Sequence, residues 1–268
     1  MEDKRHLSPG EISQPEFTFF GLQAYLGETN HLGGLKATEE LAELCHIDNN
    51  KYVLDVGCGV GITACYLAKR HGCRVVGVDI SDRMIAWAQK RAKREGVEDR
   101  IEFRTADAQN LPFGDALFDA VICESVTAFL DKQRAVSEYV RVAKPGGYVG
   151  LNEGTWIRVP PPTELVAYID RTMAQATSLT SDEWTELLGA SGLTDIRART
   201  YNFNAQSMWI NELRRVGFKD SVRTVGSFFS LYITSPPFRK YVKERMPSRK
   251  IIKNLLAYLG YGIYVGRK

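Results

Sequence analysis

The amino-acid sequence predicts an α/β fold built on a doubly wound, mostly parallel sheet. Short apolar runs alternate with amphipathic stretches of helical periodicity between residues 51 and 152. A glycine-rich turn follows the first of these runs. Strands separated by helical segments of about 10 to 15 residues need right-handed crossovers, which place parallel strands side by side and helices on both faces.

The first half of this alternation predicts three strands and two helices. The strands are expected over residues 51–56, 74–78 and 101–105, because each is a short, mostly apolar run. One helix is expected over residues 62–70, and another directly after Ser81, whose hydroxyl can accept an unpaired backbone N–H. The apolar face of this second helix consists of Met84, Ile85, Ala88 and Ala92.

The second half predicts four more strands, which makes seven. Strands over residues 118–123 and 148–152 flank a helix over 131–143, which the sequence Lys144-Pro145-Gly146-Gly147 ends. Two helices, over 163–176 and 181–191, precede a sixth strand at 194–203. Residues 204–258 are mainly helical in pattern, and residues 261–266 alternate like a seventh strand. Helical spacing also covers residues 17–47, with an interruption at 31–34, after a loose tail.

Composition narrows the function. The chain has 268 residues, 44% of them hydrophobic, and a net charge of +3, which gives no support for a dedicated nucleic-acid binder. It has no charge-free apolar run of about 18 residues, and its polar amino terminus is no secretory signal. The five cysteines include no C-x-x-C pair and have no zinc-site spacing, so we expect a reduced cytoplasmic setting and no metal site.

The turn Gly57-Cys58-Gly59-Val60-Gly61 predicts a site for a nucleotide-like ligand. Glycines allow a tight turn and a close approach of the ligand, and the following helix offers unpaired N–H groups. Asp79 ends the second strand, where a carboxylate accepts hydrogen bonds from ribose hydroxyls. Dinucleotide enzymes and methyltransferases share this combination.

Three residues distinguish between these two classes. A dinucleotide fingerprint needs Gly or Ala where this chain has Ile62. Asp55 brings a carboxylate to the position where a pyrophosphate would be repelled, and a cationic sulfonium ligand suits it better. Asp107, after the third strand, can accept a hydrogen bond from an adenine amino group.

Several motifs together resemble one family. The sequence Val53-Leu54-Asp55-Val56-Gly57-Cys58-Gly59-Val60-Gly61 closely resembles motif I of the class I S-adenosylmethionine-dependent methyltransferases. Residues 77–81, 106–108, 111–113, 118–121 and 142–147 resemble further motifs of that family, in order and with normal spacing. The resemblance covers about residues 33–153 and implies S-adenosylmethionine as the cofactor and S-adenosylhomocysteine as the product.

The resemblance also implies roles for individual residues. Asp55, Gly57 and Gly59 would line the methionine part, Asp79 would bind the ribose, and Glu124 would lie near the methyl group. Ile80 and Met84 would contact the adenine ring, and Asp107 and Ala108 its edge. The implied cofactor-binding residues are Asp55, Gly57, Cys58, Gly59, Asp79, Ile80, Met84, Asp107, Ala108 and Glu124.

The same family resemblance divides the chain. Residues 1–32 would form a tail and a helix over the cofactor site, and residues 33–155 a Rossmann-like core. Residues 156–193 would contain a first cap insertion and a helix, and 204–260 a helical cap insertion. Residues 194–203 and 261–268 would be the closing strands of the core. Insertions after the fifth and sixth strands lie near the carboxyl ends of the sheet, so they are expected to bind the methyl acceptor.

The acceptor is predicted only by class. Methyl transfer to N, O or C of a small molecule needs a base only where the acceptor must lose a proton. Glu124, His31 and Tyr25 are the candidate catalytic residues, and Glu153 and His46 are further candidates for the base. The basic, apolar stretch over residues 238–259 also suits contact with a membrane surface and a lipid- or quinone-like acceptor.

Two other function classes stay open, as does the oligomeric state. One is a nicotinamide-dependent oxidoreductase, which Asp55 and Ile62 disfavour. The other is a protein that binds S-adenosylmethionine without catalysis, which no sequence motif excludes.

Overall fold

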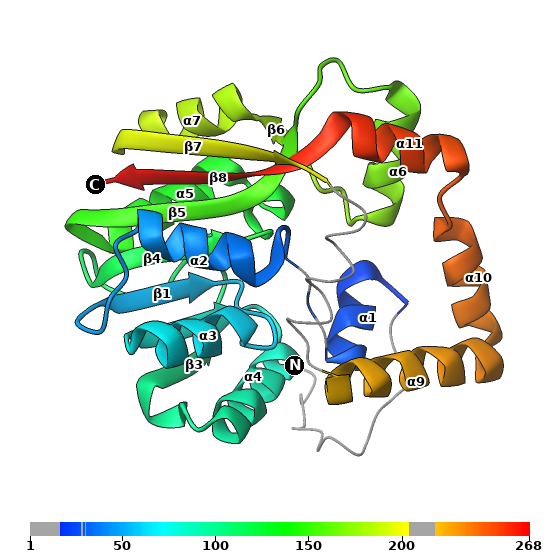
Figure 1. Cartoon of the computed structure of the whole chain (residues 1–268), viewed down its shortest axis with the longest axis horizontal. Helices are drawn as coiled ribbons and strands as arrows, with labels where there is room; N and C mark the ends of the chain where they lie inside the picture. Colours follow the sequence, from blue (N-terminus) through cyan, green and yellow to red (C-terminus); the bar gives the residue numbers. More distant parts are fainter. Residues whose placement is uncertain (1–16, 28, 30, 204–217) are drawn as a thin grey trace, which may run out of the picture.

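A computed structural model describes residues 17–27, 29, 31–203 and 218–268 of the chain (Figure 1). Its centre is a sheet with the strand order β3-β2-β1-β4-β5-β8-β7, in which a short β6 pairs with β5 beside this path. The strands are β1 (Tyr52–Val56), β2 (Arg74–Asp79), β3 (Ile101–Thr105), β4 (Phe118–Glu124), β5 (Ala143–Trp156), β6 (Leu179–Thr180), β7 (Thr194–Asn202) and β8 (Leu259–Arg267).

Strand direction confirms the predicted mostly parallel sheet. Each neighbouring pair from β3 to β5 is parallel, and β8 runs antiparallel between β5 and β7. The seven predicted strands are all present. The sequence did not predict β6, because a strand of two residues carries no periodicity.

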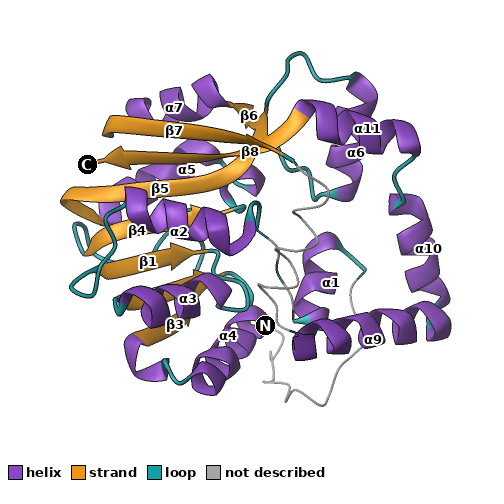
Figure 2. Cartoon of the chain, viewed as in Figure 1, coloured by secondary structure: helices purple, strands orange, loops and turns teal. Residues whose placement is uncertain are grey.

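Helices cover both faces of the sheet (Figure 2). Helices α2 (Gly34–Leu44), α3 (Ile62–His71) and α4 (Asp82–Glu95) share one buried apolar cluster with the strands, and α5 (Lys132–Val142) and α7 (Ser181–Ala190) share the other. Leu41 and Leu67 are fully buried on the first face, and Tyr139 and Trp184 on the second. This is the doubly wound arrangement that the alternating pattern predicts.

Local sequence determines where these helices begin and end. Ser81 caps α4 as predicted, since its hydroxyl accepts the N–H of Met84, and Gly96 ends the helix in the left-handed conformation. Thr180 and Glu183 form a reciprocal capping box at the start of α7. These contacts fix the helix starts at the carboxyl ends of the strands.

Strand β5 is longer than predicted. Helix α5 ends at Val142, but the sequence Lys144-Pro145-Gly146-Gly147 continues directly into β5 as a bulge rather than as a loop. Phe118 pairs with Ala143 and Ala120 pairs with Tyr148, so the residues between 143 and 148 are the extra ones. The Pro and Gly signals predict the helix end correctly, and they are equally compatible with a bulge.

A helical cap lies at the carboxyl ends of the parallel strands (Figure 1). It contains α1 (Phe19–Leu26), α6 (Thr163–Thr172), α9 (Phe218–Thr234), α10 (Pro236–Arg245) and α11 (Arg249–Tyr258). Helix α6 is shorter than the predicted 163–176, and residues 204–217 of the predicted insertion lie outside the described part. Helices α6 and α11 pack together through an apolar cluster that includes Leu165 and Leu255, and Lys250 pairs with Glu164 at 2.8 Å.

Candidate active site

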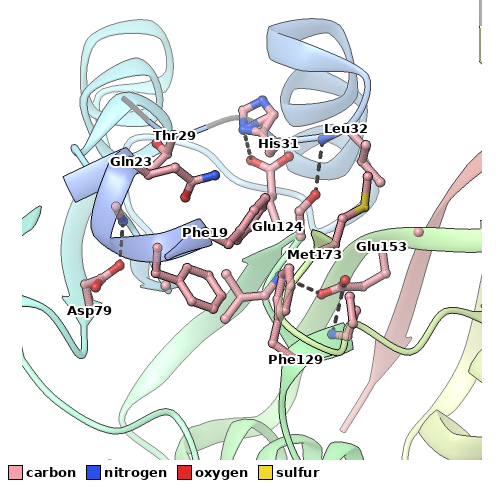
Figure 3. Close-up of a pocket in the computed structure, with 18 of the residues that line it drawn as sticks. Phe19, Gln23, Thr29, His31, Leu32, Asp79, Glu124, Phe129, Glu153 and Met173 are labelled. Atoms are coloured by element: carbon pink, nitrogen blue, oxygen red, sulfur yellow. Dashed lines mark hydrogen bonds and ion pairs between the residues drawn. The ribbon is translucent and has the colours of Figure 1, made fainter. Parts of the chain in front are cut away.

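A cavity of about 1080 Å³ lies between the carboxyl ends of the strands and the cap (Figure 3). The residues that the sequence predicts for the site line this cavity, except Tyr25 and His46. The lining residues among them are His31, Asp55, Gly57, Cys58, Gly59, Asp79, Ile80, Met84, Asp107, Ala108, Glu124 and Glu153. Tyr25 is not among the lining residues, although its neighbour Ala24 is. His46 is exposed at the far end of α2 and contacts the Tyr148 ring, with 5.1 Å between the ring centroids.

The glycine turn is in close contact with its surroundings. Gly57 and Gly59 both have positive φ, at 70° and 52°. A Cβ at Gly57 would lie 2.4 Å from Val126, and one at Gly59 would lie 2.5 Å from Thr29. Only glycine fits both the backbone conformation and these contacts, which bring the amino-terminal segment against the turn.

Asp79 joins the glycine turn to the start of α4. Its Oδ2 accepts the N–H of Gly59 at 3.0 Å, and its Oδ1 accepts the N–H of Ser81 at 2.9 Å. Burial raises the pKa of Asp79. Each carboxylate oxygen retains a further lone pair, so the side chain can still accept hydrogen bonds from a diol.

Asp55 is a buried carboxylate at the end of β1. Its exposure is 2%, and its Oδ2 has no hydrogen-bond partner among the described residues. Burial, and then the nearby charge of Glu124, raise the pKa of Asp55 well above its ordinary value. A cation bound in the cavity would pair with this carboxylate and compensate its negative charge.

Glu124 is held by three side-chain donors at the end of β4. The hydroxyls of Thr38 and Thr63 and the amide of Asn152 each donate to it at 2.9 Å. His31 lies beside it, with Nδ1 3.8 Å from Glu124 Oε1 and Nε2 3.3 Å from Thr38 Oγ1 (Figure 3). The structure thus brings together two of the predicted catalytic residues from distant parts of the chain.

Glu153 is a second fully buried carboxylate that lines the cavity. It accepts the N–H groups of Val126, Thr127 and Ala128 at 3.1, 2.7 and 3.4 Å, at the start of the short helix η2 (Thr127–Phe129). Burial outweighs these hydrogen bonds and raises its pKa from 4.5 to about 7. Sequence reasoning named Glu153 only as a candidate base, although it lies near the carboxyl end of β5 just as Glu124 lies at the end of β4.

The predicted adenine-side residues lie together at the edge of the cavity. Asp107 Oδ1 accepts the N–H of Gln109 at 2.9 Å, so one oxygen holds its own turn. Ile80 is 74% exposed although it lines the cavity, whereas Met84, which also lines it, is buried. An exposed apolar side chain beside a ligand cavity suits contact with a flat ring.

Sequence reasoning expected the cap insertions to bind the acceptor, but it did not predict which side chains meet in the apolar half of the cavity. The Phe129 ring lies 5.0 Å from Phe20 and 5.8 Å from Phe19 of α1, measured between centroids. Other apolar lining residues come from α6 and the segment after it, from the position after β7, from α11 and from the start of β8, namely Ile169, Met173, Ala176, Phe203, Ile252, Leu255, Leu256 and Leu259. These segments are far apart in the sequence, so no local motif reveals that they meet.

The chain is similar to known methyltransferases. Residues 54–151 match the family model described as a methyltransferase domain. Over 239 residues the chain is 28% identical to the 27-O-demethylrifamycin SV methyltransferase of Amycolatopsis mediterranei, which covers 87% of this chain and 83% of that protein. It is 39% identical over 119 residues to the methyltransferase GfsG of Streptomyces halstedii, and this alignment covers 44% of this chain and 43% of that protein.

The chain belongs to the class I S-adenosylmethionine-dependent methyltransferases. It is an enzyme with S-adenosylmethionine as its methyl donor. A solved structure of phosphoethanolamine N-methyltransferase 2 of Haemonchus contortus with S-adenosylmethionine superimposes with a TM-score of 0.70, over 93% of this chain and 57% of that one. At 19% identity this likeness shows the fold alone. Several further curated methyltransferases align over less than half of their own length.

The residues of this methyltransferase fit its methyl donor. S-adenosylmethionine carries two positive centres, a sulfonium and an ammonium, and Asp55 offers a buried carboxylate oxygen with no partner among the described residues. Asp79 offers acceptors for a ribose, and the turn around Gly57 and Gly59 has no side chains that would obstruct the ligand. The side chains of Asp55 and Asp79 are acidic, which suits a cation and not a pyrophosphate. The cavity lining also includes the exposed Arg83 of α4.

Proposed function

We propose that this methyltransferase transfers the methyl group of S-adenosylmethionine to N, O or C of an apolar small molecule, lipid- or quinone-like, that binds in the cap half of the cavity. The two unlike halves of the cavity support this proposal. Glycines and carboxylates line the half at the strand ends, whereas apolar side chains of α1, α6 and α11 line the other. At about 1080 Å³, the cavity exceeds the range of about 300–1,000 Å³ that suits one drug-sized ligand.

The residues at the strand ends would hold the donor. Asp79 would accept the ribose hydroxyls, and Asp55 would compensate the positive charge of the methionine part, beside the turn Gly57-Cys58-Gly59. Ile80 and Met84 would contact the adenine ring, and Asp107 and Ala108 its edge. Each of these residues lines the cavity, which supports this assignment.

The cap would position the acceptor and exclude water. Bound S-adenosylmethionine supplies an electrophilic methyl group. Phe19 and Phe129 would press the acceptor toward the strand ends, where Glu124 is held by its three donors. Fixing the two reactants in line, in a site without bulk water, supplies much of the rate enhancement of such a transfer.

His31 would act as the base for an acceptor that must lose a proton. Its ring lies beside Glu124, with 3.8 Å between Nδ1 and Oε1, and Thr38 contacts its other nitrogen. A proton taken up at Nδ1 would create an imidazolium that the Glu124 carboxylate stabilises. Such an arrangement of a base and an orienting carboxylate contributes about 10²- to 10⁴-fold to a rate.

Turnover with a panel of acceptors tests the proposed function. Purified enzyme and S-adenosylmethionine are incubated with apolar phenols, quinols and amines, and with small polar amines, and S-adenosylhomocysteine is quantified. We expect turnover with the apolar set. Turnover confined to the polar set would contradict the proposal.

Two substitutions, one directly after α6 and one on it, test the location of the acceptor. Met173→Glu places a charge in the apolar half, so we expect the KM for the acceptor to rise at least tenfold while the affinity for S-adenosylmethionine stays unchanged. Val166→Glu is the matched control, because Val166 is 43% exposed on α6 and does not line the cavity. Equal effects of both variants would refute the placement.

A further inference from the structure

Helix α9 of the cap exposes apolar side chains in a regular stripe. Val225, Phe229, Tyr232 and Ile233 of α9 are 54%, 59%, 43% and 73% exposed. Their spacing of four, three and one residues places them on one side of the helix. We call these four residues the α9 stripe. A stripe of this kind on a solvated surface indicates a binding partner.

The helices that follow the α9 stripe are basic. Between residues 236 and 258 the chain has seven basic side chains and one acidic one, Glu244. Some of the basic groups have partners within the cap, such as Lys250 with Glu164. Lys243, Arg249 and Lys253 make no ion pair with any described residue and are exposed. The end of α9, helix α10 and the start of α11 therefore combine exposed apolar side chains with positive charges that no described residue pairs with.

The cavity reaches this basic face at α11. Ile252 and Leu256 line the cavity and are nevertheless 45% and 38% exposed, so they lie at its mouth. Arg249 and Lys253 share their side of the helix, because residues 249, 252, 253 and 256 follow the spacing of one helical face. Two cations thus flank an apolar opening.

Helix α10 lies on the side of the cap that is farthest from the sheet. The end of α9 and the start of α11 meet it there, and α11 then runs back toward β8 (Figures 1 and 2). None of the described helices is long and apolar enough to cross a bilayer. An apolar stripe with basic side chains next to it suits the surface of an anionic membrane, where lipid headgroups attract the cations and the apolar side chains insert. A second copy of the chain would suit this face less well, because it would bring like charges together.

We propose that the side of the cap formed by the end of α9, by α10 and by the start of α11 docks the enzyme on an anionic membrane, and that the acceptor enters the cavity from the bilayer beside Ile252 and Leu256. The second part rests on the proposed function, since it needs an apolar acceptor. Docking at the mouth would spare an apolar acceptor the passage through water.

Vesicle binding tests the docking without any turnover. Full-length enzyme is sedimented with phosphatidylcholine vesicles and with vesicles that also contain phosphatidylglycerol. We expect binding to the anionic vesicles that weakens with salt. Arg249→Gln with Lys253→Gln should weaken it about 25-fold, from about fivefold for each charge at the surface. Phe229→Ser with Ile233→Ser should weaken it also in high salt, because it removes the inserted side chains.

A charge-matched variant is the control. Lys69→Gln with Lys93→Gln removes the same charge from exposed positions on α3 and α4, and vesicle binding should stay as in the wild type. An equal loss in this control, or absence of binding to anionic vesicles, would overturn the proposal. Self-association through the same face, detected by a loss of dimer in the Phe229→Ser with Ile233→Ser variant, would overturn it as well.

Turnover separates the failure of this inference from failure of the proposed function. The Arg249→Gln with Lys253→Gln variant should methylate an acceptor in detergent as the wild type does, but should lose about 25-fold activity toward the same acceptor in vesicles. Wild-type turnover in detergent without vesicle binding would overturn the docking and leave the proposed function intact. Vesicle binding without turnover of any apolar acceptor would support the docking and contradict the proposed function.

Discussion

Three buried carboxylates at the strand ends differ in how the protein satisfies them, and this difference supports the assignment of the donor site. Asp55, Glu124 and Glu153 form no ion pair with a lysine or arginine of the described chain, and each line the same cavity. Their environments differ. Glu124 has side-chain donors, Glu153 has backbone donors, and Asp55 has an oxygen without a described partner. The residue that is least satisfied by the protein is the one that we assign to the cationic donor.

Glu153 should make stability depend on pH. Burial raises the pKa of Glu153 to about 7 in the folded protein, against 4.5 in the unfolded chain. The stabilising contribution of Glu153 to the free energy of unfolding is therefore fully present below about pH 4.5 and is lost as the pH rises through about 7. The shift corresponds to about 3 kcal/mol in the free energy of unfolding. Glu153→Gln mimics the neutral form, so it should gain stability relative to the wild type as the pH rises. Urea unfolding at about pH 5 and about pH 8 measures this difference, and a constant difference would contradict it.

Asp79→Ala should weaken the binding of S-adenosylmethionine by about 1 to 3 kcal/mol, which is the cost of losing charged hydrogen bonds. Calorimetric titration measures the affinity. Asp82→Ala is the control, because Asp82 begins α4 close by, bonds to Thr105 and does not line the cavity. An unchanged affinity in Asp79→Ala would refute the assignment to the ribose.

At the scale of elements, the sequence predicts what local patterns determine. The strands β1 to β5, the cap at Ser81 and the end of α5 follow from apolar periodicity and from capping residues. The bulge within β5 and the strand β6 depend on which neighbour the chain meets, so no local pattern predicts them. The same limit applies to the site. Asp55 and Asp79 could be found from one motif, whereas the contact of Phe20 with Phe129 joins residues from two distant segments.

A single added methyl group at Gly59 should disturb the contact between the glycine turn and Thr29 of the amino-terminal segment. Gly59→Ala introduces a Cβ 2.5 Å from Thr29 and a left-handed backbone that costs an alanine about 1 kcal/mol. Gly96→Ala has the same backbone cost, with φ at 68°, but its Cβ would meet nothing within 4 Å. We therefore expect a larger fall in Tm for Gly59→Ala and a loss of donor affinity only there. Equal changes in both variants would show that Thr29 moves away freely.

At the scale of the whole molecule, burial makes the thiols inert. All five cysteines are buried, and burial raises the pKa of Cys65 to about 12 and that of Cys73 to about 11. Only a thiolate reacts rapidly with disulfide reagents. We expect the native enzyme to show almost no reaction near neutral pH and five reactive thiols after unfolding. Rapid labelling of a thiol in the native enzyme would contradict the closed packing, and Cys58 is the most informative position because it lines the cavity.

Helix α11 of the cap is joined to the sheet without a loop. Helix α11 ends at Tyr258 and strand β8 begins at Leu259, so no loop residue separates them. Strand β8 is bonded on one side to β5 and on the other to β7. A tilt of α11 cannot be absorbed by flexible backbone, so it must strain two ladders of hydrogen bonds in the sheet.

This junction should couple the motion of β8 in the sheet to the motion of α11 in the cap. An acceptor or a bilayer that immobilises α11 should slow amide hydrogen exchange in residues 260–262 of β8, while β2 and β3 at the other end of the sheet serve as the internal reference. Slower exchange in α11 without any change in β8 would show that the junction is compliant. If the junction is stiff, a displacement of α11 at the membrane side of the enzyme is transmitted to β8 inside the sheet.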